Sequence, residues 1–358
     1  RALCCSAFAL LTMAGCDALS TTCTTRGCTR RHGELGDDGA VLIAAGAAIE
    51  KGVVPPCQLP IISMASSNHF KQLLGSLGSI LHNEPKRHVA VFDIGLTALE
   101  ARQVAKLSRV QLLRFPFHSY PAHVRISQSR KGLNYAFQLL QKELALSMLA
   151  DGRLKFPEPC CSDSVLFLDA SIEVRPIGLA EIDRIVQTQG YFLTLQRPTL
   201  FEHTPDAYFA VFGSNKKAVS ERLGVGASTL QALQQVSGGI NAMRLDSALA
   251  QQVLTPAAAC ARNYSCMVPN VSRSEKNCCW SQGLLSAGAY TFRLRIHGER
   301  RFWHASTHGP TPSDGVLLTM RAGYKSQWRL GSPLPQSRIT TGPTKGSSHR
   351  HPSRLNNS

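Results

Sequence analysis

The chain has 358 residues, of which 43% are hydrophobic and 17% charged, and its formal net charge is +16. That composition is typical of a globular protein with unstructured additions, with room for one large domain or two small ones. The basic residues are scattered and no homeodomain, zinc-finger or RNP-type signature accompanies them, so we do not expect specific binding to nucleic acid. The charge favours nucleotide-bearing substrates or anionic membrane surfaces instead.

The twelve cysteines and the glycosylation motifs indicate an oxidising compartment. No pair of CxxC motifs occurs, which disfavours a structural zinc site. Three Asn-x-Ser sequons occur, at Asn263, Asn270 and Asn356. Two of them flank Cys266, and sequons beside cysteines fit a secretory lumen. Cys260 and Cys266 are expected to form a local disulfide, while the partners of the cysteine pairs at 160–161 and 278–279 are left open.

The first predicted segment is apolar. Residues 2–16 follow Arg1 and are too short to span a bilayer, so we interpret them as the end of a signal-anchor or a signal-peptide core, with a buried helix as the alternative. The Thr-, Gly-, Cys- and Arg-rich residues that follow predict a poorly ordered stem. Residues 1–57 are therefore expected to be a targeting remnant and stem, from a protein of the Golgi or one that is secreted.

A regular alternation of strands and helices follows from residue 58. Predicted strands cover residues 61–65, 88–92, 110–115, 164–168 and 191–195. Predicted helices cover residues 70–81, 97–107, 133–148 and 177–187. Thr97 and Glu100 predict a capping box, and Gly190 a helix stop. This order predicts an α/β fold with a mostly parallel sheet flanked by helices.

The pattern becomes irregular further along the chain. It predicts a strand at 240–244, a helix over 246–254 and a strand over 290–296, which we expect to form an acceptor pocket over the α/β core. The core domain is assigned to residues 58–310. Residues 311–358 are expected to be a mostly disordered, basic tail.

Asp169 is the strongest candidate for a site residue. It follows a buried apolar strand, and in open α/β sheets ligands gather at the carboxyl ends of strands. A carboxylate there with the Ser171 hydroxyl nearby suits a divalent ion that is bound through the phosphates of a nucleotide. The alternative is that Asp169 only caps the turn after the strand.

Several motifs in order resemble a known family. They are Ser66-Ser67-Asn68-His69-Phe70, Phe92-Asp93-Ile94-Gly95-Leu96, Phe115-Pro116-Phe117, Tyr120-Pro121 and Leu168-Asp169-Ala170-Ser171. Over residues 60–290 the chain resembles an uncharacterised eukaryotic family related to nucleotide-diphospho-sugar transferases, of GT-A glycosyltransferase fold. The resemblance implies a GT-A-like fold, a nucleotide-sugar donor and a glycan or protein acceptor.

The resemblance also implies roles for matching residues. Ser66 and Asn68 would lie near the nucleotide, and Asp93 would face the same cleft. Asp169 and Ser171 would stand where related enzymes carry an Asp-x-Asp motif that holds Mn²⁺ or Mg²⁺ on the diphosphate. Because Ser171 replaces a carboxylate, the metal would be held more loosely, completed by water, or absent.

Other positions depart from the family pattern. A family lysine is replaced in the run Tyr135-Ala136-Phe137-Gln138-Leu139, although Lys131 stands nearby and is a candidate for binding substrate. The segment 278–283 lacks a family aspartate but keeps Gln282 as a candidate. His203 is a further candidate, with a loop histidine as its alternative.

Some candidates also have purely structural interpretations. Asp93 could serve only to cap the turn before Gly95. His69 begins a helix and is favoured as a capping or packing residue. The late histidines at 297, 304 and 308 are favoured as solvated loop residues rather than metal ligands.

The sequence therefore predicts a glycosyltransferase-like enzyme in which Asp169 is catalytic. Its first alternative is a degenerate, non-catalytic relative that binds a nucleotide-sugar, a glycan or a protein. A basic nucleic-acid-associated protein is a second alternative that rests on charge alone.

Overall fold

The computed structural model of the chain describes residues 57–126, 135–225, 233–268, 281–298, 302, 304–305 and 316–319. The predicted targeting segment and stem up to residue 56, Lys131, and most of the predicted tail lie outside these residues. In the described ranges, no helix has the length and apolar character needed to cross a membrane.

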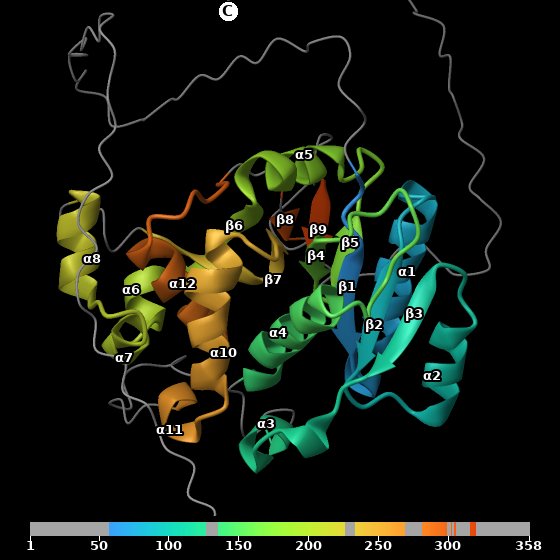
Figure 1. The fold of residues 1–358 in the computed structure, drawn as a ribbon, viewed down its shortest axis with the longest axis horizontal. Coiled ribbons are helices and arrows are strands. Elements are labelled where there is room, and N and C mark those ends of the chain that lie inside the picture. Colours follow the sequence, from blue (N-terminus) through green and yellow to red (C-terminus); the bar gives the residue numbers. More distant parts are fainter. Residues whose placement is uncertain are drawn as a thin grey trace, which may run out of the picture. The chain divides into compact units, whose positions relative to one another are not determined.

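The core is a six-stranded sheet in the order β3-β2-β1-β4-β7-β6 (Figure 1). Its strands are β1 (Ile61–Ala65), β2 (Val89–Asp93), β3 (Val110–Arg114), β4 (Ser164–Leu168), β6 (Tyr191–Thr199) and β7 (Gln234–Arg244). β1, β2, β3 and β4 run parallel to one another, and β7 runs antiparallel to both of its neighbours, β4 and β6. The predicted α/β class with a mostly parallel sheet is confirmed.

Helices cover both faces of this sheet. The longer ones are α1 (Phe70–Asn83), α2 (Ala98–Ala105), α4 (Ala136–Ala150), α5 (Ala180–Gln189), α8 (Lys216–Leu223) and α12 (Ser281–Thr291). The shorter ones are α3 (Ala122–Ile126), α6 (Leu200–His203), α7 (Asp206–Ala210), α10 (Thr255–Ala261) and α11 (Tyr264–Met267). The apolar sides of α1, α2 and α5 pack in one core cluster, and those of α4, α10 and α12 in the other.

The alternation of β1 shows why both faces must be covered. Ile61 and Ala65 belong to the core cluster on the α1 side, and Ile62 and Met64 to the cluster on the α4 side. A central parallel strand is buried on both faces, so its sequence is apolar throughout. The predicted capping box of Thr97 and Glu100 is confirmed, as is the helix stop at Gly190, whose φ is +84°.

The prediction of a strand over residues 290–296 is wrong. Tyr290 lies in α12, which is buried along its whole length. Gly288 allows this close packing, because a Cβ there would lie 2.6 Å from Val253 Cγ1. The alternation of apolar and polar residues over 290–296 indicates a strand, but the packing of α12 takes Tyr290 and Thr291 into the helix.

Two further elements extend past the predicted boundaries. The helix expected over 246–254 begins as a π-helix at Leu249–Leu254 and continues into α10. β9 (Leu317–Thr319) lies beyond residue 310 and joins a second sheet with β5 (Ile172–Val174) and β8 (His304–Ala305).

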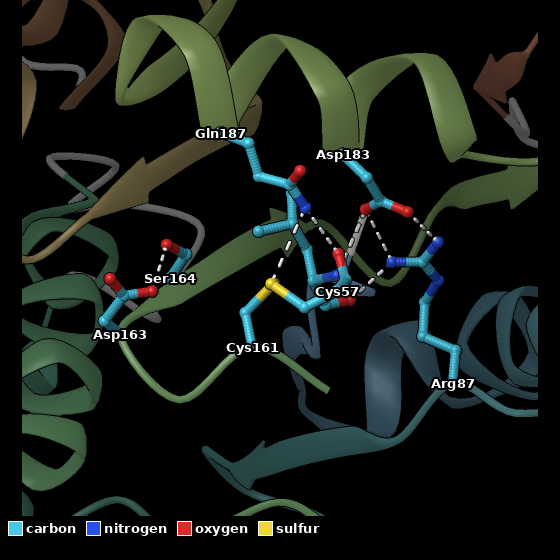
Figure 2. The surroundings of a disulfide bond; sticks show 8 residues. Cys57, Arg87, Cys161, Asp163, Ser164, Asp183 and Gln187 are labelled. Carbon is cyan, nitrogen blue, oxygen red and sulfur yellow. Dashed lines mark hydrogen bonds and ion pairs between the residues drawn. A yellow bond between two sulfur atoms is a disulfide. The ribbon is translucent and has the colours of Figure 1, made fainter. Parts of the chain in front are cut away.

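Two disulfides form among the described cysteines. Cys260 pairs with Cys266, as predicted, and Cys57 pairs with Cys161 across 104 positions of sequence. Cys160 is buried and reduced. The long-range disulfide holds the entry to β1 beside the segment that leads into β4 (Figure 2).

A buried arginine fixes the same region. The Arg87 side chain is 1% exposed, and its Nη2 lies 2.7 Å from Asp183 Oδ2 and 3.1 Å from Glu84 Oε2. Its Nη1 donates to Leu59 O, and Asp183 Oδ1 accepts from Leu59 N. Figure 2 shows Arg87 reaching Asp183 on α5. The cluster therefore ties the start of β1 to the end of α1 and to α5.

Arg87→Met is expected to lower the free energy of unfolding by about 3–5 kcal/mol, because it leaves two buried carboxylates without their cation. Chemical denaturation measures the difference. The matched control is Arg153→Met, whose side chain is 58% exposed and pairs with Asp151 at the surface. Arg153→Met is expected to lower the free energy of unfolding by less than about 1 kcal/mol. Equal losses in the two variants would contradict the prediction.

Candidate functional site

A cavity of about 250 Å³ opens at the carboxyl ends of the parallel strands. β1 has β2 on one side and β4 on the other, so the chain changes direction across the sheet between β1 and β4. Ligands of open α/β sheets bind at such a switch point. The cavity is lined there by Ser66 after β1 and by Asp169 and Ser171 after β4.

Other elements close the cavity. β7 contributes Gly238 and Gly239, and the starts of α4 and α12 contribute Gln138 and Gln282. Further polar or aromatic side chains that line it are His69, Tyr135, Gln196 and Ser281. Asp169 is the one acidic residue among the described lining residues.

Asp169 is held against the backbone of β7. Its N–H donates to Gly239 O at 2.9 Å, and Ile172 N donates to its carbonyl at 2.9 Å. A Cβ on Gly239 would lie 2.2 Å from Asp169 Oδ2, so only glycine leaves room for this carboxylate. The backbone of Asp169 thus forms the turn while its side chain faces the cavity, and the two interpretations of the residue are compatible.

The charge of Asp169 is set by its surroundings. The residue is partly exposed to the cavity. Burial of the carboxyl group raises its pKa, and the positive charges of Lys142 and His69 lower it in part. The net direction is upward, so protein cations only partly offset the cost of burying this charge.

Lys142 is a buried cation that the sequence interpretation missed. The residue is 2% exposed, and its Nζ donates to Gly238 O at 3.0 Å and lies 5.2 Å from the centre of the Phe167 ring. It stands one helical turn after Gln138, the position where the family pattern has its lysine, so both side chains lie on one face of α4. The i, i+4 spacing was the signal that could have found it.

Two glutamines and a tyrosine shape the wall of the cavity. Ser281 donates to Gln138 Oε1, which joins the starts of α12 and α4. Gln282 is 6% exposed, and its Nε2 has no hydrogen-bond acceptor within the described residues. Tyr135 precedes α4 with φ +50°, a left-handed conformation that a tyrosine rarely adopts and that is enriched at functional sites.

The predicted site residues are only partly brought together. Ser66, Asp169, Ser171 and Gln282 line the cavity, and Asn68 lies exposed in the 3-10 turn beside it. Lys131 lies outside the described residues.

Two other candidates lie away from this cavity. Asp93 Oδ1 accepts from Gly95 N and Leu96 N, at 2.8 and 2.7 Å, and the residue lines a second cavity. His203 ends α6, where its carbonyl accepts from Gln235 and its ring lies 3.5 Å from Glu202.

The donor atoms partly suit a divalent cation. Asp169 and Ser171 offer the oxygen atoms that Mg²⁺ and Mn²⁺ prefer, but no group of three His, Cys, Asp or Glu residues gathers in the described part of the chain. Mg²⁺ is commonly held by one or two carboxylates together with substrate phosphates. The site therefore fits such an ion only when a ligand supplies phosphate oxygens.

No protein-family model and no curated protein sequence matches the chain. Among solved structures it is similar to the galactosyltransferase LgtC in complex with donor and acceptor sugar analogs, with 14% identity, a TM-score of 0.41, and coverage of 73% of this chain and 87% of that one. It is similar to mouse xyloside xylosyltransferase 1, with 11% identity, a TM-score of 0.41 and coverage of 74% and 98%. It is also similar to the bifunctional glycosyltransferase WbbM, with 11% identity, a TM-score of 0.42, and coverage of 75% of this chain and 46% of that one. All three are glycosyltransferases, the class that the sequence motifs resemble, but at these scores nothing further about this chain rests on the likeness.

Gly239→Ala is expected to lower the free energy of unfolding by about 1–3 kcal/mol, because the new methyl group overlaps the Asp169 carboxylate. In an Asp169→Ala background most of this cost should disappear, which a double-mutant cycle measures. The control is Gly238→Ala, whose Cβ would meet Gln282 Cβ at 3.3 Å, and whose cost should not depend on residue 169. Additive effects at 239 and 169 would contradict the contact.

Lys142 is expected to make the free energy of unfolding depend on pH in the alkaline range. Burial, offset in part by Asp169, lowers the pKa of Lys142 from 10.5 to about 8. Between these values the unfolded chain holds a proton that the folded chain has released, so the free energy of unfolding rises with pH. The stability of Lys142→Met relative to wild type should fall by about 3 kcal/mol from pH 7 to 10.5. Urea denaturation across this range measures it.

The matched control for the pH series is Lys217→Met on α8, because that side chain is 86% exposed. Its stability curve should run parallel to that of the wild type. A Lys142→Met curve that is also parallel would show that Lys142 keeps its ordinary pKa.

Proposed function

We propose that the protein transfers a sugar from a nucleotide-diphosphate donor to a hydroxyl group of a glycan or protein acceptor. The observation that carries the proposal is the Asp169 carboxylate in a cavity at the β1–β4 switch point, with Lys142 buried behind it. Such a position in an open α/β sheet is where nucleotide ligands are bound.

The cavity suits the sugar-phosphate end of the donor. At about 250 Å³ it is smaller than the 300–1,000 Å³ typical of pockets that enclose a whole drug-sized ligand. The nucleoside would therefore lie at its edge, between Ser66 in the lining and Asn68 beside the cavity. The Gln282 amide, buried and without an acceptor, would donate a hydrogen bond to a ligand oxygen.

Lys142, Asp169 and Ser171 would have different electrostatic roles. Lys142 favours the ionised form of Asp169. Because a carboxylate repels a diphosphate, Asp169 would act on the donor through a bound cation, with the help of Ser171. When bound, Mg²⁺ or Mn²⁺ held by Asp169 and Ser171 would neutralise charge on the leaving diphosphate. Fixed positions of donor and acceptor and the preset charges of the site would supply most of the rate.

The cysteines support a proposal for the compartment. Two disulfides among the described residues suit an oxidising environment, so we place the protein in the secretory pathway, in the Golgi lumen or secreted. An N-terminal membrane anchor belongs to the same proposal.

A non-catalytic relative is the second candidate. Its support is that Asp169 stands without a second acidic residue among the described lining residues, since Ser171 occupies the position of the partner. Such a protein would bind a nucleotide-sugar, a glycan or a protein partner without turnover.

A thermal-shift screen of nucleotide-sugars with and without Mn²⁺ tests the proposal. A donor present at 100 times its Kd adds about 2.7 kcal/mol to the free energy of unfolding, which corresponds to a rise of roughly 5 °C in Tm. The rise should depend on Mn²⁺ and disappear in Asp169→Asn, and the exposed control Asp246→Asn should keep it.

Turnover separates the two candidates. Release of nucleoside diphosphate in the presence of acceptor hydroxyls supports the transferase, and donor binding without release supports the non-catalytic relative. If no nucleotide-sugar changes the Tm of the wild type, the transferase proposal is refuted.

A further inference from the structure

A second cavity of about 730 Å³ lies beside the Asp169 cavity. It is formed at the carboxyl ends of β2 and β3, and Ile94 lines both cavities. The two cavities are therefore adjacent along the edge of the sheet where the parallel strands end.

The second cavity carries excess positive charge. Arg114 ends the edge strand β3, Arg125 lies in α3, and both are exposed side chains in the lining, together with His118. Within the described part of the chain neither arginine forms an ion pair. The acidic residue of the lining, Asp93, pairs in register with Arg114 on the neighbouring strand, yet its Oδ1 is engaged by Gly95 N and Leu96 N.

An aromatic cluster supports this charged rim. The Phe115 ring is buried and stacks on Tyr120 with centroids 5.1 Å apart, and Phe117 meets its edge at 4.7 Å. Phe115 and Phe117 also line the cavity. The packed rings hold the backbone segment that carries Arg114 and His118 at the rim of this cavity.

We propose that this second cavity binds a compact oxyanion, a phosphate, sulfate or carboxylate, on a ligand whose other end occupies the Asp169 cavity. The planar guanidinium group of arginine matches the paired oxygen atoms of such an oxyanion. Arg114 and Arg125, neither of which forms an ion pair in the described part of the chain, both line this cavity. The nature of the ligand rests on the proposed function, whereas the charge of the cavity does not.

The oxyanion has two sources, a phosphate of the nucleotide donor or an acidic group on the acceptor glycan. Isothermal titration of the full chain with two matched pairs of probes distinguishes them. One pair is UDP and uridine, and the other is 3′-sulfolactose and lactose. In each pair the sugar or nucleoside is the same and the charged group is removed.

The variant is Arg114→Gln combined with Arg125→Gln. We expect it to weaken at least one charged probe tenfold or more and to leave both uncharged probes unchanged. The charged probe that is affected identifies the source. Raising NaCl from 50 to 500 mM should weaken that probe more in the wild type than in the variant. The matched control is Arg184→Gln on α5, an exposed arginine far from β3 in sequence, which should bind every probe like the wild type.

Three outcomes overturn the inference. The wild type binds no charged probe more tightly than its uncharged counterpart, or the double variant binds all probes as the wild type does, or Arg184→Gln loses as much affinity as the double variant. Asp169→Asn separates this failure from that of the proposed function. A donor response that needs Asp169 but ignores the two arginines refutes the oxyanion subsite alone.

Discussion

The contact between the Asp169 carboxylate and the backbone of Gly239 is the constraint on which the site depends. β7 enters the sheet beside β4 in the antiparallel direction and brings two consecutive glycines to the end of that strand. Gly239 leaves room for the carboxylate, and the carbonyl of Gly238 binds the ammonium group of Lys142. One pair of glycines thus sets the positions of the acid and of its buried cation.

This arrangement carries a cost in stability. The buried lysine and the half-buried carboxyl group both lose hydration, and their mutual attraction offsets only part of that cost. Gln141 and Asn241 add buried polar atoms without partners among the described residues. Such a concentration of unfavourable burial is typical of a functional site, where strain and desolvation are retained for binding or chemistry.

At the opposite end of the sheet the buried charges are paired. Arg87 meets two carboxylates and a backbone carbonyl, and the Cys57–Cys161 disulfide lies near the same entry to β1. Both features act at the amino end of the sheet, opposite the cavities. The sheet is therefore held firmly at one end, and the side chains that face ligands gather at the other. Ile94 borders both cavities, so the two are neighbours at that end of the sheet.

The order of apolar runs, the capping box at Thr97 and Glu100 and the position of Asp169 after a buried strand were all readable from the sequence, because local periodicity and turn chemistry encode them. Only the tertiary structure decided that Tyr290 lies in a helix, because the residues from Tyr290 onward alternate between apolar and polar, which is the local pattern of a strand. It also decided that Asp93 caps its turn beside a second cavity and that Lys142 lies behind Asp169. Those outcomes depend on contacts between residues far apart in the chain, such as Lys142 and Gly238, which no local pattern records.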